Sequence, residues 1–230
     1  MDYNNLTVAN KNLIKRFSHS KRFMLSAELI NKYNPNKILD YGAGDGEIFK
    51  YIKKHYKKKF YFYEPNKNMA KQLKLNLRKY KVNKVFFYSH QIYKNYFDLI
   101  TINEVFEHLN LSGKKEIIKN LKKISVKKCI YVISVPIEIG TSSILKNFVR
   151  IITSQKHENT NLQNLIKSFL YMKIERPTKK YNESHIGFNY MLFLKFLKNE
   201  NFKIIEIKYS PFHFFRGFIN SQIFIVAKLR

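Results

Sequence analysis

The sequence predicts one α/β domain with a doubly wound, seven-stranded sheet that is mostly parallel and has an antiparallel strand at its terminal end. Short apolar runs alternate with segments of helical period along the 230 residues, and strands joined through helices form right-handed crossovers. A hydrophobic content of 45% is enough for one sizeable core and too little for two domains. A glycine-rich turn follows the first apolar run, where such a sheet binds its ligand.

The first half of the chain alternates helices and strands. Apolar residues at helical spacing predict a helix over 7–33, and a short apolar run predicts the first strand at 37–41. Helices at 47–56 and 67–80 then flank an aromatic strand at 60–63. Two further strands follow, at 85–88 and at 97–102.

The second half continues this alternation and then departs from it. A helix at 112–124 precedes a strand at 129–135, and a helix at 189–199 precedes strands at 202–209 and 222–228. No helix separates the last two strands, so they should pair antiparallel.

We expect a single domain over residues 1–230, with an N-terminal helical cap at 1–34 and a substrate-recognition insertion at 138–187. The insertion has apolar residues at the spacing of two amphipathic helices. These residues are Ile144, Phe148, Ile151, Ile152, Leu162, Leu165, Ile166 and Phe169. We expect the helices to pack on the sheet and to cover the substrate.

The chain is strongly basic, with 43 Lys and Arg against 16 Asp and Glu, a formal charge of +27. Such an excess suits a polyanion, either nucleic acid or an anionic membrane surface. However, Lys, Asn, Ile, Tyr and Phe, which have AT-rich codons, make up roughly half of the chain. The excess is also even, +12 over residues 1–110 and +15 over 111–230. An even spread favours compositional drift over a nucleic-acid footprint.

The composition also restricts the class of protein. An aromatic content of 16% argues against disorder, and a single cysteine, Cys129, excludes a disulfide scaffold. Cys129 stands in an apolar run, which predicts that it is buried. The first twelve residues lack the apolar stretch of a signal peptide, and no window is apolar enough for a membrane span. We therefore expect a cytoplasmic protein.

The first chemical motif is the glycine-rich turn Asp40-Tyr41-Gly42-Ala43-Gly44-Asp45-Gly46. Glycines let the backbone turn tightly and approach a ligand. No Gly-Lys-Ser/Thr follows, so the turn is not a P-loop, and its spacing is not the GxGxxG of dinucleotide sites. The flanking carboxylates would repel a pyrophosphate and would suit a cationic ligand.

A second motif is Glu64, at the end of the second expected strand. A carboxylate there can accept hydrogen bonds from both hydroxyls of a ribose. It could instead only cap the helix that begins near Asn66. Its spacing from the glycine turn favours the ribose.

The runs ILDYGAGDG, FYFYEPN and YFDLITINEVFEHL together resemble the class I S-adenosylmethionine-dependent methyltransferases. This resemblance implies a Rossmann-like methyltransferase fold with S-adenosyl-L-methionine as its cofactor. The residues that it implies for cofactor binding are Asp40, Gly42, Gly44, Gly46, Glu64 and Asn103. One position departs from the family, which usually has an acidic residue after the third strand; here His90 or Gln91 stands in its place and would contact the adenine.

The run Ile102-Asn103-Glu104-Val105-Phe106-Glu107-His108-Leu109 follows the fourth strand, where the reactive methyl group should lie. Histidine is the natural base near neutral pH, so we expect His108 to deprotonate a hydroxyl, with Glu107 or Glu104 orienting it. A helical pair of Glu104 and His108, without any catalytic role, is the alternative.

A divalent metal is a further alternative. Glu104, Glu107 and His108 could join the more distant His185 to bind Mg²⁺ or Mn²⁺. This set is similar to that of small-RNA terminal 2′-O-methyltransferases and of some quinone-precursor O-methyltransferases. The same run also occurs in class I enzymes that use no metal, so we predict catalysis without one.

The leading hypothesis is therefore a methyltransferase that acts at oxygen on a small molecule or a glycan-type metabolite. The alternatives are a metal-dependent RNA ribose 2′-O-methyltransferase and a non-catalytic regulatory domain that binds the cofactor. The oligomeric state and the acceptor are not predicted by the sequence.

Overall fold

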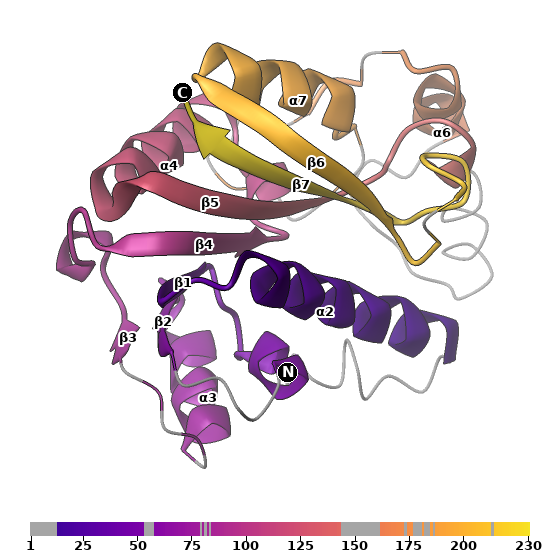
Figure 1. Ribbon diagram of the computed structural model, residues 1–230. Helices are drawn as coiled ribbons and strands as arrows, with labels where there is room; N and C mark the ends of the chain where they lie inside the picture. The colour runs from indigo at the N-terminus through magenta and orange to yellow at the C-terminus, as the bar shows by residue number, and fades with distance from the viewer. Residues whose placement is uncertain are drawn as a thin grey trace.

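The computed structural model in Figure 1 describes most of the chain. The described residues are 13–52, 58–78, 80, 82, 84–143, 162–172, 174–176, 181, 185, 187–212 and 214–230.

A seven-stranded sheet runs through the molecule with the strand order β3-β2-β1-β4-β5-β7-β6. Its strands are β1 (Lys37–Tyr41), β2 (Lys59–Tyr63), β3 (Lys84–Phe86), β4 (Phe97–Asn103), β5 (Ser125–Pro136), β6 (Phe202–Ser210) and β7 (Gln222–Leu229). Strands β1 to β5 pair in parallel, and β7 is antiparallel to both β5 and β6. The expected doubly wound α/β fold with an antiparallel terminal strand is therefore confirmed. Strands β2 and β3 follow β1 on one side, and β4 and β5 lie on its other side. The order of the strands therefore reverses between β1 and β4, which makes the gap between their carboxyl ends the switch point.

Helices cover both faces of the sheet (Figure 1). One face packs against α2 (Leu13–Tyr33) and α3 (Lys67–Leu77), and the other packs against α4 (Leu111–Ile124) and α7 (Tyr190–Asn199). Successive strand residues point to opposite faces, so Ile38 joins the first core and Leu39 joins the second. A further helix, α6 (Leu162–Phe169), lies beyond the end of β5.

Asparagines fix where three of these helices begin. The side chains of Asn66, Asn110 and Asn189 each accept a backbone hydrogen bond at the N-terminus of α3, α4 and α7. Such caps satisfy amide groups that the first helical turn leaves unpaired. The cap of α3 therefore belongs to Asn66, not to Glu64.

Several boundaries differ from the expectation. The helix predicted at 47–56 is wrong over its described part, because a 3-10 helix, η1 (Glu47–Tyr51), ends there in the extended residue Ile52. Strand β3 is shorter than predicted, and β5 is longer by four residues at its beginning. One predicted amphipathic helix of the insertion is present as α6, whereas residues 144–161 lie outside the described part.

Two smaller expectations can also be compared with the structure. Cys129 is buried in β5 as predicted, and burial raises the pKa of its thiol. Among the described residues, no helix has both the length and the apolar character needed to cross a membrane.

Candidate active site

The parallel topology brings the ends of several strands to one edge of the sheet (Figure 1). The glycine turn follows β1, Glu64 follows β2, and the loop 104–108 follows β4. Because β1 pairs with both β2 and β4, these three segments are neighbours. The sequence motifs therefore meet at the switch point, where a sheet of this kind binds its ligand.

The glycine turn depends on the conformations that only glycine adopts readily. Gly42, Gly44 and Gly46 have φ angles of +79°, +59° and +78°. A Cβ atom at Gly42 would lie 2.5 Å from Val105 Cγ2, and one at Gly46 would lie 2.5 Å from Leu73 Cδ1. The turn therefore packs directly against the loop after β4 and against α3.

Glu64 holds the turn in place. Its Oε2 accepts a hydrogen bond from the amide of Gly44 at 2.8 Å, and its Oε1 accepts one from the amide of Asn66 at 2.8 Å. Burial raises the pKa of the carboxyl, and these two amides oppose that rise. A carboxylate has about four acceptor positions, so each oxygen keeps one for a ligand.

Two buried carboxyl groups flank the turn. Asp40 Oδ1 accepts a hydrogen bond from the Thr101 hydroxyl at 2.7 Å, and burial raises the pKa of Asp40 to about 7. Asp45 is also buried, which raises its pKa, and its Oδ2 has no hydrogen-bond partner among the described residues. Buried acceptors without partners favour a ligand that brings positive charge or donors.

Helix α2 reaches the same edge. The Ser26 hydroxyl lies 3.4 Å from Asn103 Oδ1, which also accepts a hydrogen bond from Ser134 at 3.0 Å. The Tyr51 hydroxyl donates to the hydroxyl of Ser20 at 3.4 Å. Helix α2 therefore connects the end of β4 with η1.

The side chain of Arg22, in α2, is buried at this edge of the sheet. Arg22 is only 4% exposed, and its Nη1 lies 3.6 Å from Glu104 Oε2. Glu104 itself has a φ of +55°, so it does not form a helical pair with His108. The short 3-10 helix η3 (Phe106–His108) begins only after it.

Glu107, His108 and His185 form a cluster beside these residues. Glu107 Oε1 lies 3.8 Å from His185 Nδ1 and 4.0 Å from His108 Nε2. One ligand atom from each residue lies within 4.8 Å of the other two. Glu107 is fully buried, and burial raises its pKa well above the ordinary value, as does the neighbouring Glu104. The fourth predicted metal ligand, Glu104, is adjacent but falls outside this group.

Two cations near Glu107 were not singled out in the sequence. Burial lowers the pKa of Lys114 to about 8, and it also lowers the pKa of Arg176; Glu107 opposes both shifts. Lys114 Nζ and Arg176 Cζ lie 5.2 and 6.0 Å from the centre of the Phe188 ring. Lys114 stands among the many lysines of an amphipathic helix, so no signal in the sequence distinguishes it.

The two residues predicted to contact the adenine lie in η2 (Ser89–Gln91), which follows β3. His90 is exposed and stacks on Tyr88 with ring centres 5.5 Å apart. Gln91 Oε1 accepts hydrogen bonds from the amides of Phe87 and Tyr88, so its oxygen is already engaged. This leaves the ring of His90 and the amide nitrogen of Gln91 as the groups that could face a ligand.

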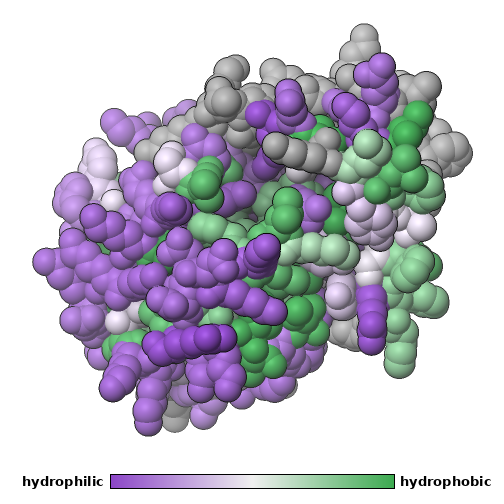
Figure 2. All heavy atoms as spheres, turned by 90° about the horizontal axis from the view of Figure 1, so that it is seen from above, coloured by the Kyte–Doolittle hydropathy of each residue, from purple (hydrophilic) through white to green (hydrophobic). Residues whose placement is uncertain are grey.

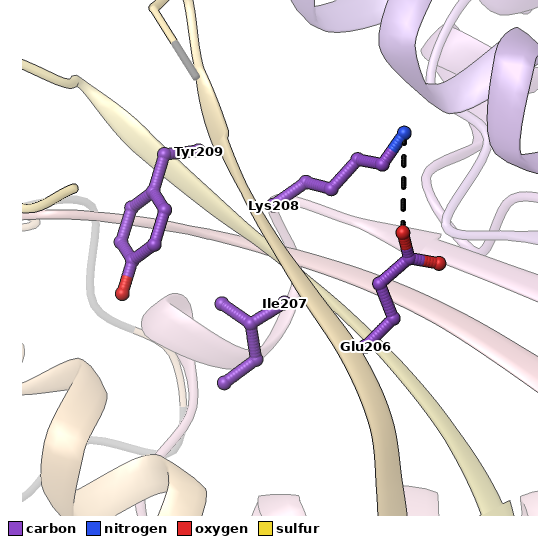
Figure 3. A pocket seen from close by; sticks show the side chains of 4 residues that line it. All are labelled: Glu206, Ile207, Lys208 and Tyr209. Carbon is purple, nitrogen blue, oxygen red and sulfur yellow. Dashed lines mark ion pairs between the residues drawn. The ribbon is translucent and has the colours of Figure 1, made fainter. Parts of the chain in front are cut away.

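A surface pocket lies on β6, away from the candidate site. It is lined by four consecutive residues of β6, Glu206, Ile207, Lys208 and Tyr209 (Figure 3). Lys208 and Glu206 face one another across it, with Nζ 4.0 Å from Oε1. None of the candidate residues lines this pocket, and it is not the site.

Comparisons with known proteins bear on the family and the fold. Residues 10–165 match the family model described as a methyltransferase domain. The solved structure of the PH0226 protein from Pyrococcus horikoshii OT3 is similar, with a TM-score of 0.65 and 11% identity over 99% of this chain and 96% of that chain. No curated protein sequence matches this chain.

Two further solved structures share the fold. A SAM-dependent methyltransferase from Aquifex aeolicus has a TM-score of 0.57 and 15% identity over 94% of this chain and 97% of that chain. The magnesium protoporphyrin IX methyltransferase (ChlM) from Synechocystis PCC 6803, with bound SAH, has a TM-score of 0.59 and 10% identity over 95% of this chain and 88% of that chain.

Proposed function

This chain belongs to the class I S-adenosylmethionine-dependent methyltransferases, and from that premise we propose that it methylates a hydroxyl oxygen of a small molecule or a glycan-type metabolite. Family membership makes it an enzyme rather than a non-catalytic cofactor-binding domain. The observation that carries the choice of oxygen is the buried Glu107 between His108 and His185.

The residues around the glycine turn fit the cofactor. The unpartnered Asp45 Oδ2 and the buried Asp40 suit a positively charged sulfonium group. Glu64 would receive the ribose hydroxyls, the turn from Gly42 to Gly46 would pass beside the methionine portion, and Asn103 would complete that side. His90 or Gln91 would lie against the adenine. When bound, S-adenosylmethionine supplies an electrophilic methyl group.

The chain's own contribution to catalysis is a base and the groups that hold it. The imidazole of His108 would take the proton of the acceptor hydroxyl, so that the oxygen attacks in line with the bond that breaks. Glu107 would position His108 and stabilise its protonated form. Glu104, paired with Arg22, is a neighbour of Glu107. Lys114 and Arg176 would balance the charge of the buried carboxyl groups.

Transfer of labelled methyl from S-adenosylmethionine into fractions of a cell extract tests this proposal. We expect label in the metabolite or glycan fraction. His108→Ala should lower turnover about 10²-fold or more, as expected for loss of a general base, while cofactor affinity stays unchanged. His90→Ala is the matched control, because it should weaken cofactor binding and leave the chemical step intact.

An unchanged kcat in His108→Ala would overturn the role of this histidine. Label that disappears after ribonuclease treatment would overturn the metabolite acceptor. Glu107→Gln, which keeps the size of the side chain, should lower kcat and shift the lower limb of the pH profile. A purely structural role of Glu107 would instead change stability and leave the shape of that profile intact.

A second candidate is a metal-dependent RNA ribose 2′-O-methyltransferase, and one observation favours it. Both oxygens of Glu107 are buried without a hydrogen-bond partner among the described residues, with two imidazoles next to them. Carboxylate and imidazole ligands suit Mn²⁺ or Mg²⁺. Glu107, His108 and His185, with Glu104 beside them, would hold the ion, which would polarise the ribose hydroxyl.

Calorimetric titration with Mn²⁺ alone separates the two candidates. Binding that is lost in His185→Ala, together with activity that a chelator removes and Mn²⁺ restores, would support the metal enzyme. No heat of binding and full activity in chelator would leave the metal-free base mechanism.

A further inference from the structure

The loop between β6 and β7, residues 211–219, presents large apolar side chains to solvent. Phe214 is 95% exposed, Phe218 is 67% exposed and Phe215 is 52% exposed. Single exposed apolar residues are ordinary, but a contiguous group of this size marks a surface that meets a partner. The methyl-transfer site does not account for these phenylalanines.

The loop is held from its inner side by Asn220, which is fully buried. The side-chain oxygen of Asn220 accepts a hydrogen bond from the Phe212 amide at 2.7 Å. Its amide nitrogen donates to the carbonyl oxygens of Phe212 and Arg216, both at 2.6 Å. These bonds satisfy backbone polar groups within the loop, which is what an apolar surrounding requires of a polypeptide. Asn220 therefore fixes the backbone of the loop while the phenylalanines point to solvent.

The segment after β5 joins this loop to α6. The hydroxyls of Thr141 and Ser142 donate to backbone carbonyls of the loop at 2.8 and 2.5 Å. The amide of Gly140 donates to the carbonyl oxygen of Ser168 in α6 at 3.0 Å. The end of α6 and the residues that follow it are apolar and about half exposed at Ile166, Leu170 and Met172.

We call Phe214, Phe215, Phe218, Ile166, Leu170 and Met172 together the apolar tip. Figure 2 shows hydrophobic side chains gathered on the right-hand side of the molecule, where the β6–β7 loop and α6 lie, whereas the left-hand side is mostly hydrophilic.

We propose that the apolar tip docks this enzyme on an anionic lipid bilayer. Exposed aromatic and aliphatic side chains enter the interface, and a net charge of +27 is attracted to acidic lipid headgroups. A second copy of the chain is a poor partner, because two molecules of this charge repel one another. Single-stranded RNA stacks on aromatic rings interleaved with basic residues, whereas this tip is half aliphatic and the loop contains a single arginine, Arg216.

The tip lies at the same edge of the sheet as the candidate site. Strand β6 is antiparallel to β7, which is antiparallel to β5, so β6 runs parallel to β1 and β4. The β6–β7 loop therefore follows the carboxyl end of β6, as the glycine turn follows that of β1. Docking through the tip turns the site edge toward the bilayer.

Cosedimentation with vesicles tests the proposal. We expect the wild-type chain to bind vesicles of phosphatidylcholine with roughly a third of phosphatidylglycerol, and to bind pure phosphatidylcholine far more weakly. The double variant Phe214→Ser/Phe218→Ser should lower the partition coefficient at least about tenfold. Leu75→Ser is the matched control, since Leu75 is 62% exposed on α3, far from the tip, and should bind like the wild type.

Three results would overturn the proposal. The double variant could bind the anionic vesicles as the wild type does, which would mean that charge alone is responsible. It could convert a wild-type dimer into a monomer in sedimentation velocity, which would make a second copy the occupant. It could lose RNA binding and keep vesicle binding, which would make the tip a stacking platform. Equal stability and equal cofactor affinity of the variants would show that the fold is unaffected.

A fluorescent reporter gives an independent readout, because the chain contains no tryptophan. Phe214→Trp should show a blue-shifted emission on addition of anionic vesicles and quenching by lipids with brominated acyl chains. Leu75→Trp should show neither. An unshifted Phe214→Trp spectrum in vesicle-bound protein would contradict insertion of the loop.

Discussion

Two carboxylates of the sheet make the same kind of bond at opposite ends of the strands. Glu64 accepts two backbone amide hydrogen bonds at the carboxyl edge. The Asp98 carboxylate accepts hydrogen bonds from the backbone amides of Asn36 and Lys37 at 2.9 and 2.8 Å, where β1 begins. The two residues therefore share a structural role, and only Glu64 stands at the proposed cofactor site.

Variants of Glu64 and Asp98 distinguish a role in cofactor binding from a role in folding. Glu64→Gln should weaken S-adenosylmethionine binding at least about tenfold in calorimetry, because it removes a charged acceptor for the ribose hydroxyls. Asp98→Asn should lower the free energy of unfolding by about 1–2 kcal/mol and leave the affinity unchanged. An unaltered affinity in Glu64→Gln would show that the cofactor lies elsewhere.

The buried Asp40 carboxyl gives the fold a pH dependence. Its pKa of about 7 lies above that of an unfolded aspartate, so the folded chain binds this proton more tightly. The stabilisation is complete below about pH 4 and is lost as the pH rises through 7. Between pH 6 and pH 8, denaturant unfolding should report a loss of about 1 kcal/mol from this group. Asp40→Asn should remove that part of the slope, and an unchanged slope would contradict this assignment.

At the scale of elements, the glycine turn is fixed by its contact with the loop after β4. Gly42→Ala combines a positive φ with a Cβ atom 2.5 Å from Val105 Cγ2, and it should cost about 2–3 kcal/mol of unfolding free energy. The variant should also bind the cofactor more weakly, because the turn has to shift.

Gly113→Ala in α4 is the matched control. Its Cβ would meet Leu109 only at 3.4 Å, and its φ is not positive. Alanine there should be neutral or should stabilise the chain by up to about 1 kcal/mol. Equal losses in the two variants would show that the contact with Val105 is not responsible.

The elements divide into those that the sequence predicts and those that it does not. Strand and helix order follow from the alternation of apolar runs, and the antiparallel terminal pair follows from the missing helix between its strands. The 3-10 helix at 47–51 was missed, because its apolar spacing resembles that of an α-helix while its end at Ile52 is set by packing on the sheet.

The site shows the same division. The glycine turn, Glu64 and the Glu107–His108 run are local motifs that the sequence can single out as candidates, whereas Arg22 and Lys114 reach the candidate site from helices. Their burial depends on tertiary packing that no local pattern contains. The sequence suggests His185 only as a ligand of the alternative metal site. His185 Nδ1 lies 3.8 Å from Glu107 Oε1 because the fold brings together two residues that are more than 70 positions apart.

For the molecule as a whole, the excess of positive charge opposes compaction. Salt should screen this repulsion, so the melting temperature should rise by a few degrees between low and about physiological ionic strength. Surface pairs such as Lys32–Glu206 oppose this trend, but exposed pairs contribute little.

Differential scanning calorimetry in increasing sodium chloride measures this balance. The variants Lys71→Gln and Lys115→Gln reduce the charge at exposed positions and should shrink the effect of salt. A melting temperature that falls with added salt would mean that the individual ion pairs outweigh the net repulsion.

The contact between Gly42 and Val105 restricts how this enzyme can diversify over evolution. Val105 Cγ2 occupies the space that a side chain at position 42 would need. A larger residue at position 105 would therefore disturb the turn that every acceptor requires. Under the proposed function, new acceptors would be accommodated through residues 138–187, the segment expected to recognise the substrate, and through the β6–β7 loop, while the two contacting loops change together.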